Sequence, residues 1–266
     1  MIILGYIAAV FMGLVLGVIG GGGSMLTVPI LVYLMGVEPS VATGYSLLIV
    51  GATAAFGAVH YFREGLIDVK ASIIFAIPSI FTVYLTRAYL MPSVPDIFIT
   101  SPFEVSKNIV IMVLFAILML GSAAMMLRKA YSKPNIDINA VKTITPNRLL
   151  IVIQGAALGL ISGILGAGGG FLIIPTLVLF MGMPMKKAVG ASLFIIALNS
   201  LIGFSGDLQA GIELAVPLVP LMLLATFVGI AVSTKISSKL NDGALQKFFA
   251  IFTLVIAVFI MSKELA

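Results

Sequence analysis

Residues 13–29 read Gly13-Leu-Val-Leu-Gly-Val-Ile-Gly-Gly-Gly-Gly-Ser-Met-Leu-Thr-Val-Pro29, an apolar run that four consecutive glycines interrupt. The pattern returns 146 residues later as Gly159-Leu-Ile-Ser-Gly-Ile-Leu-Gly-Ala-Gly-Gly-Gly-Phe-Leu-Ile-Ile-Pro175. The two copies align without a gap over 53 residues, with 19 identical pairs, as far as Gly65 and Gly211. The chain is therefore predicted to contain two structural repeats, each built around a glycine-rich break.

The composition indicates a membrane protein. Apolar residues make up 61% of the chain and charged residues only 9%, and the mean hydropathy is +1.24, whereas a soluble domain is about 25% charged. The apolar runs are much longer than the ~10-residue alternating strands of an outer-membrane barrel. We therefore predict an all-α, polytopic helical membrane protein. The absence of cysteine excludes disulfides and thiolate metal sites, and neither a metal nor a cofactor is expected.

The apolar runs predict about five helical segments in each repeat. A helix spanning residues 2–36 without interruption would be about 52 Å long, too long for a bilayer, so breaks are expected at residues 20–23 and 166–170. The short segments 24–36 and 170–183 are then half-helices or thin, tilted spans, and both possibilities stay open. The predicted division is a first transmembrane repeat, a linker and a second transmembrane repeat, at residues 1–128, 129–147 and 148–266.

The distribution of Lys and Arg predicts the orientation in the membrane. Residues 128–148 carry five basic side chains against one acid, Asp137, so the linker should be cytoplasmic. Threading the chain from there places both termini and residues 92–106 outside, and residues 235–246 inside. The two repeats would then be inverted, with glycine-interrupted hairpins that meet at the membrane centre. The basic charge thus reflects membrane orientation, and nucleic acid is not an expected partner.

Each glycine cluster, at residues 20–24 and 166–170, is a candidate anion site. Glycine permits a sharp turn and a close approach of other groups, and a helix that begins after it presents free N–H groups and the positive end of its dipole. The alternative is a hairpin turn with only a packing role, since membranes tolerate non-helical backbone where protein buries it. Because valine adds a Cβ and excludes φ > 0, it should block the site at Gly22 or Gly168.

Two further motifs carry small polar side chains at equivalent positions of the repeats. These are Thr43-Gly44-Tyr45-Ser46 and Val189-Gly190-Ala191-Ser192, each followed by a polar residue in the same span, Thr53 and Asn199. Their hydroxyl and amide groups could bind an oxyanion. They could equally bond their own helix or a neighbouring one, and both interpretations stay open.

Three ionisable residues, His60, Arg87 and Asp207, lie in or near apolar runs, where such side chains are often functional. His60 and Asp207 are the candidates for coupling transport to a proton, although anchoring at the membrane interface explains them equally well. Arg87 can snorkel to the surface. Few basic side chains are then expected in the core, so an anion would be held mainly by backbone N–H groups and hydroxyls. The coupling ion would be a proton or sodium.

The glycine clusters, the prolines six residues after Gly23 and Gly169, the Gly-x-Ser pairs and the duplication together resemble the sulfite exporter TauE/SafE family, also called the toluene-sulfonate uptake permeases. The resemblance covers essentially the whole chain. It implies an inner-membrane carrier of small sulfur-containing or organic anions such as sulfite, sulfonates or sulfoacetate. It also implies a central site lined by Gly22, Gly23, Ser24, Ser46, Gly168, Gly169, Gly170 and Ser192.

The predicted function is secondary transport by alternating access at the interface between the repeats. A passive anion channel or uniporter could share the paired glycine loops and is the alternative. A membrane-embedded enzyme is disfavoured, because the chain has one histidine and no H-E-x-x-H motif. The sequence sets no oligomeric state.

Overall fold

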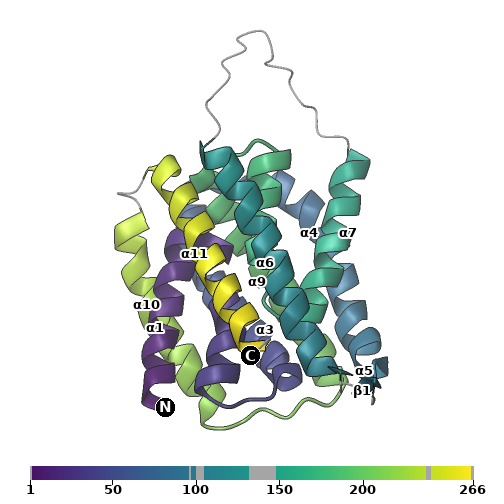
Figure 1. Ribbon diagram of the computed structural model, residues 1–266. Helices are drawn as coiled ribbons and strands as arrows, with labels where there is room; N and C mark the ends of the chain where they lie inside the picture. Colours follow the sequence, from purple (N-terminus) through teal and green to yellow (C-terminus); the bar gives the residue numbers. More distant parts are fainter. Residues whose placement is uncertain (1, 96, 100–104, 132–147, 238–240, 265–266) are drawn as a thin grey trace.

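The structure is a computed structural model that describes residues 2–95, 97–99, 105–131, 148–237 and 241–264. It is a bundle of helices (Figure 1), and six helices in the described part of the chain are long and apolar enough to cross a membrane. The predicted all-α, polytopic fold is confirmed, with one short antiparallel ribbon of β1 (Ile97–Ile99) and β2 (Val105–Ser106) beside it. The elements are α1 (Ile2–Ile19), η1 (Gly20–Gly22), η2 (Ser24–Leu26), α2 (Thr27–Pro29), η3 (Ile30–Leu34), α3 (Pro39–Arg63), α4 (Val69–Leu85), η4 (Thr86–Leu90), α5 (Met91–Ser93), β1 (Ile97–Ile99), β2 (Val105–Ser106), α6 (Lys107–Tyr131), α7 (Arg148–Leu165), α8 (Gly170–Pro175), η5 (Thr176–Phe180), α9 (Met185–Gln209), α10 (Leu218–Ser237) and α11 (Asp242–Glu264).

Both predicted glycine breaks are confirmed. Helix α1 ends at Ile19 and helix α7 at Leu165, and the glycine that follows each has a positive φ, +69° at Gly20 and +67° at Gly166. The returning segments, Ser24–Leu34 and Gly170–Phe180, cover about 16 Å each, roughly half of a bilayer core. This length favours half-helices over thin, tilted spans.

The main contacts between helices are symmetric. Each has an equivalent in which every helix is replaced by its counterpart in the other repeat. Helix α1 packs on α10, and its counterpart α7 packs on α4, the counterpart of α10. The pairs α3 with α9 and α6 with α11 each join one helix to its own counterpart. Corresponding helices run in opposite directions in Figure 1, which is the arrangement expected of an inverted repeat. Helices α3 and α9 are the most buried of the six candidate spans and form the centre.

Glycines allow the α1–α10 and α4–α7 pairs to approach closely. A Cβ added at Gly13 would lie 2.1 Å from the carbonyl oxygen of Thr226, and one added at Gly159 would lie 2.2 Å from that of Ser79. Small residues commonly join membrane helices in this way, because they let the two backbones come into contact. The first helix of each repeat therefore packs through its glycine face.

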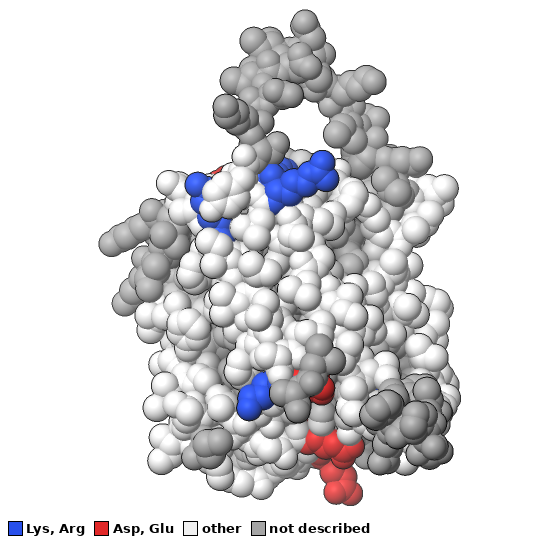
Figure 2. Space-filling view, viewed as in Figure 1, with Lys and Arg blue, Asp and Glu red and all other residues white. Residues whose placement is uncertain are grey.

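The two ends of the bundle differ in charge. The N- and C-terminal ends of the chain lie at one end in Figure 1, and α6 ends and α7 begins at the other. Figure 2 shows Lys and Arg mostly at the upper end and Asp and Glu mostly at the lower end, with a broad uncharged band between them. Large apolar side chains are exposed around the sides, such as Phe81 (65%), Leu224 (61%) and Val255 (59%). This surface is that of a multi-pass membrane protein.

Candidate functional site

The two glycine loops touch each other through their backbones. A Cβ added at Gly21 would lie 2.2 Å from the Cα of Gly170, and one added at Gly170 would lie 2.2 Å from the Cα of Gly21. Every residue from 20 to 24 and from 166 to 170 is buried. The hairpins thus meet as predicted, and their loops are closed to both ends of the bundle. Their position at the membrane centre stays a prediction.

In the first loop, bonds within the protein occupy several of the polar groups. The N–H of Gly21 donates to Ser192 Oγ at 3.3 Å, and Ser192 Oγ in turn donates to the carbonyl of Val189 at 2.8 Å. Ser24 Oγ donates to the carbonyl of Gly21 at 2.7 Å. Ser192 on α9 therefore contacts the first glycine loop directly.

The predicted left-handed backbone is absent at Gly22. Gly20 is the glycine of this loop that has φ > 0, so valine at Gly22 would not be excluded by a positive φ, and that part of the prediction was wrong. The space there is nevertheless filled, because a Cβ at Gly22 would lie 2.8 Å from Cδ2 of Phe249 on α11. A Cβ at Gly23 would meet the backbone N of Leu16, at 2.2 Å, in the helix of its own hairpin. Both glycines are thus required for close packing.

The second loop faces polar side-chain atoms that have no hydrogen-bond partner in the described part of the chain. Gly166, Gly168 and Gly169 all have φ near +67°, and α8 begins directly after them. A Cβ added at each would meet a side-chain nitrogen or oxygen at 2.5, 2.7 and 3.2 Å, respectively. Each of these atoms is buried and has no hydrogen-bond partner among the described residues. They are Arg87 Nη2, Ser200 Oγ and Ser162 Oγ.

The remaining predicted hydroxyl and amide residues divide into two kinds. Ser46 is buried, and its Oγ has no hydrogen-bond partner in the described part of the chain. The hydroxyl of Thr53 has partners within the protein. Its Oγ1 donates to the carbonyl of Ile49 at 2.6 Å and lies 2.7 Å from Thr226 Oγ1 on α10. Asn199 Nδ2 donates to Ser79 Oγ on α4 at 2.6 Å. Thr53 and Asn199 therefore link central helices, and Ser46 keeps a free hydroxyl.

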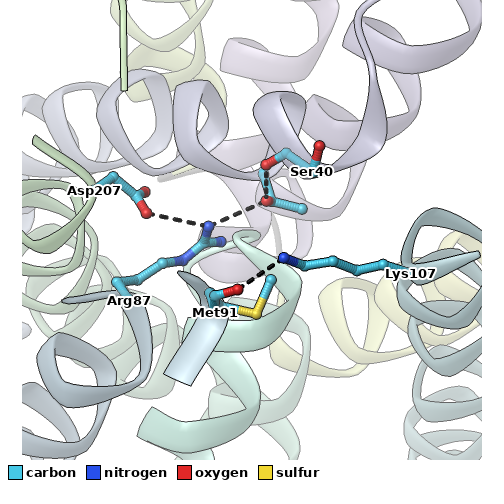
Figure 3. A network of polar contacts seen from close by, with 6 residues as sticks. Ser40, Arg87, Met91, Lys107 and Asp207 are labelled. Carbon is cyan, nitrogen blue, oxygen red and sulfur yellow. Dashed lines mark hydrogen bonds and ion pairs between the residues drawn. The ribbon is translucent and has the colours of Figure 1, made fainter. Parts of the chain in front are cut away.

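That Arg87 lies in the core was not predicted from the sequence. Its side chain is 2% exposed, so the predicted snorkelling to the surface was wrong. Arg87 Nη1 donates to Thr43 Oγ1 at 3.1 Å and lies 3.4 Å from Asp207 Oδ1 (Figure 3). Thr43 Oγ1 then donates to the carbonyl of Ser40 at 2.7 Å. The π-helical turn η4 carries Arg87, so the guanidinium is held between α3, α9 and the second glycine loop.

The two proposed coupling residues are far apart. Helices α3 and α9 are antiparallel, because Gly44 near the start of α3 faces Asp207, and Gly190 near the start of α9 faces Tyr61. His60 and Asp207 therefore lie at opposite ends of this pair. His60 is partly exposed and its Nε2 is 3.2 Å from Glu64 Oε1, an arrangement that fits anchoring at a helix end. A single proton path through both side chains is not formed.

The comparisons with known proteins identify the family. The family model described as "Sulfite exporter TauE/SafE" matches residues 5–260. The chain belongs to the sulfite exporter TauE/SafE family. A probable membrane transporter protein of Xylella fastidiosa (strain 9a5c) is 30% identical over 193 residues, 71% of this chain and 67% of that protein. YunE of Bacillus subtilis, also named a probable membrane transporter protein, is 28% identical over 252 residues, 88% of this chain and 90% of its own length.

A protein of Haemophilus influenzae, also named a probable membrane transporter protein, is 28% identical over 266 residues that cover 92% of each chain. No solved structure matches the sequence. Since the family model covers nearly the whole chain and these relatives are all named as membrane transporter proteins, the protein is a membrane transporter.

Ser192 and Ser46 are equivalent in the repeats but differ in their bonds, which gives a matched test. Ser192→Ala should lower the free energy of unfolding by about 1–3 kcal/mol, because it leaves the buried N–H of Gly21 without its acceptor. Ser46→Ala removes a hydroxyl that has no partner among the described residues and should leave stability almost unchanged. Thermal unfolding of the purified protein measures both. Equal shifts of Tm would contradict this description of the two loops.

Proposed function

We propose that this transporter carries small sulfur-containing or organic anions, of the sulfite, sulfonate or sulfoacetate class, by alternating access. The observation that carries the proposal is the second glycine loop. Buried donor atoms from three elements face its left-handed glycines and have no hydrogen-bond partner among the residues that the structure describes, namely Arg87 Nη2, Ser162 Oγ and Ser200 Oγ. A small oxyanion accepts hydrogen bonds from such donors, and from the N-terminus of a helix such as α8. The description of the family as sulfite exporters supports the same substrate class.

The difference between the two loops supports alternating access. The hydroxyl of Ser192 bonds the first loop, whereas that of its counterpart Ser46 has no partner in the described chain. The repeats thus have different conformations at equivalent positions. Exchange of the two conformations about the Gly21–Gly170 contact would open the site to one side and then to the other. The residues proposed to bind the anion in one state or the other are Gly22, Gly23, Ser24, Ser46, Gly168, Gly169, Gly170 and Ser192, with Thr53 and Asn199 beside them.

A passive channel is the second candidate, and one observation speaks against it. All residues of both loops are buried, so the loops close the bundle instead of lining an open pore. A carrier needs such a closed state on its cycle, whereas a conducting channel does not.

A screen of anions by thermal shift tests the proposal. The purified protein should gain stability with at least one of sulfite, thiosulfate and sulfoacetate, because a ligand that binds the folded state raises the apparent stability by RT ln(1 + [L]/Kd). Taurine, which adds an ammonium group to a sulfonate, is the control for net charge. A protein whose Tm responds to none of these anions at millimolar concentration would contradict the proposed substrate class.

The orientation is proposed from the positive-inside rule, with both termini outside the inner membrane. Tyr131 ends α6 and is 67% exposed, while Val216 lies between α9 and α10 and is 78% exposed. Because the chain has no cysteine, each can be replaced by a single cysteine. An impermeant maleimide should label Val216→Cys but not Tyr131→Cys in intact cells, and both after the cells are opened. Labelling of Tyr131→Cys in intact cells would reverse the proposed orientation.

A further inference from the structure

A buried ion pair beside the second glycine loop suggests how transport is coupled, and this inference rests on the proposed function. Arg87 is 2% and Asp207 7% exposed. The two come from η4 and α9, and Thr43 on α3 completes the group. Burying two charges is costly unless each is well paired and hydrogen-bonded. Here Arg87 Nε, Arg87 Nη2 and Asp207 Oδ2 have no hydrogen-bond partner among the described residues.

The geometry leaves one edge of the guanidinium free for a ligand. Both contacts of Arg87 use Nη1, so Nε and Nη2 remain as a pair of parallel donors. Such an edge binds the two oxygens of a carboxylate, phosphate or sulfonate group in a bidentate manner. Nη2 lies 2.5 Å from the position that a Cβ at Gly166 would take, so this donor borders the second glycine loop. An anion that enters the loop could therefore bond to Nε and Nη2 while Nη1 stays bonded to Thr43.

The arrival of an anion changes the charge balance of this group. Arg87 faces one carboxylate before binding and would face two anionic groups after it, in a buried place where charges are weakly screened. Lys107 on α6 points toward the same region, but its Nζ donates to the carbonyl of Met91 at 2.7 Å (Figure 3). Other titratable side chains at this end form hydrogen bonds with groups other than Arg87 and Asp207. The hydroxyl of Tyr45 donates to the carbonyl of Glu213, and that of Tyr84 donates to Gln209. The carboxylate of Glu38 accepts from Asn108.

We propose that Arg87 is the side chain that binds the transported anion and that Asp207 takes up one proton when the anion binds. The proton adds to the carboxylate of Asp207, which becomes a neutral carboxylic acid, and the guanidinium then pairs with the anion. Oδ2 is the free oxygen and lies 3.1 Å from the Cβ position of Gly44. When the anion leaves, the proton leaves as well and Asp207 pairs again with Arg87. The protein would therefore move one proton with each monovalent anion.

Calorimetric titration with 2-hydroxyethanesulfonate tests both parts, because its sulfonate stays ionised throughout the pH range used. Measured in two buffers of different protonation enthalpy, the wild-type protein should take up close to one proton per anion. Its affinity should fall as the pH rises, by up to about tenfold per pH unit. Asp207→Asn should bind the anion at least as tightly and take up no proton.

The double variant Arg87→Gln/Asp207→Asn tests whether Arg87 binds the anion. It removes both charges together, so no unpaired buried charge is left to unfold the protein, and its Tm verifies folding. It should bind the anion about a hundredfold more weakly, the loss expected for a charge-assisted contact. Arg63→Gln, at the exposed end of α3, removes the same charge elsewhere and should bind like the wild type.

The outcomes separate this inference from the function on which it rests. Unchanged affinity in the double variant, or proton uptake that is absent in the wild type or retained in Asp207→Asn, would overturn the inference alone. A wild-type protein that binds neither this sulfonate nor sulfite, thiosulfate or sulfoacetate would overturn the proposed function, and the inference with it.

Discussion

Gly21→Ala and Gly170→Ala are each expected to abolish the folded transporter, whereas Gly121→Ala should not. The Cβ of either variant would lie 2.2 Å from a backbone atom of the opposite loop. The nearest atoms belong to the backbone of the opposite loop and cannot move aside as a flexible side chain can, so the two hairpins would have to separate. We expect destabilisation at or beyond the upper end of the 1–3 kcal/mol typical of overpacked cores.

Gly121 on α6 is the matched control for this pair. It is exposed, and nothing lies within 4 Å of the position of its Cβ. Alanine there should be neutral or stabilise the helix by about 0.5–1 kcal/mol. The yield of monodisperse protein and its Tm measure all three variants. Wild-type yield and Tm for Gly21→Ala would contradict direct contact between the loops.

Gly168→Ala is expected to eliminate transport, while Gly182→Ala should keep it. Both glycines have φ +66°, so alanine pays the same cost of a left-handed backbone at each, about 1–2 kcal/mol. They differ in their surroundings. A Cβ at Gly168 would lie 2.7 Å from Ser200 Oγ and 2.9 Å from Cγ2 of Ile196, whereas nothing lies within 4 Å at Gly182.

Comparing these two variants therefore separates the effect of filling the space beside the second loop from the effect of backbone strain, which both share. Uptake of labelled sulfoacetate or sulfite into proteoliposomes, normalised to folded protein, is the measurement. Transport by Gly168→Ala at the rate of Gly182→Ala would remove the second loop from the site. Gly22→Val should also impair transport, but through its contact with Phe249 and not through φ.

The hairpins were predictable because their cause is local. A run of apolar residues longer than a membrane is thick has to break, and residues 20–23 and 166–170 are the points where glycine makes a break least costly. The contact between the loops followed from the duplication, since equivalent hairpins of a repeat approach each other at its interface. No assumption about distant side chains was needed for either prediction.

The position of Arg87 could not be predicted from its neighbours. An arginine near the end of an apolar run normally extends to the membrane surface. Its burial depends on η4 and on partners 44 and 120 residues away, Thr43 and Asp207. The difference between Ser46 and Ser192 was equally hidden, because identical residues at equivalent positions have different bonds in the two repeats. One signal was available: Arg87 and Asp207 are opposite charges within apolar runs on the same predicted side.

Counterflow is the measurement that tests the central claim most directly, namely that the glycine loops form the anion site of an alternating-access carrier. Proteoliposomes preloaded with unlabelled sulfoacetate or sulfite are diluted into a trace of the labelled anion. A carrier exchanges inside for outside anion, so the label should rise transiently above its equilibrium level with the wild-type protein and not with Gly168→Ala. If the wild-type protein gives no overshoot with sulfoacetate and none with sulfite, the central claim is contradicted. An equal overshoot with Gly168→Ala would contradict it as well.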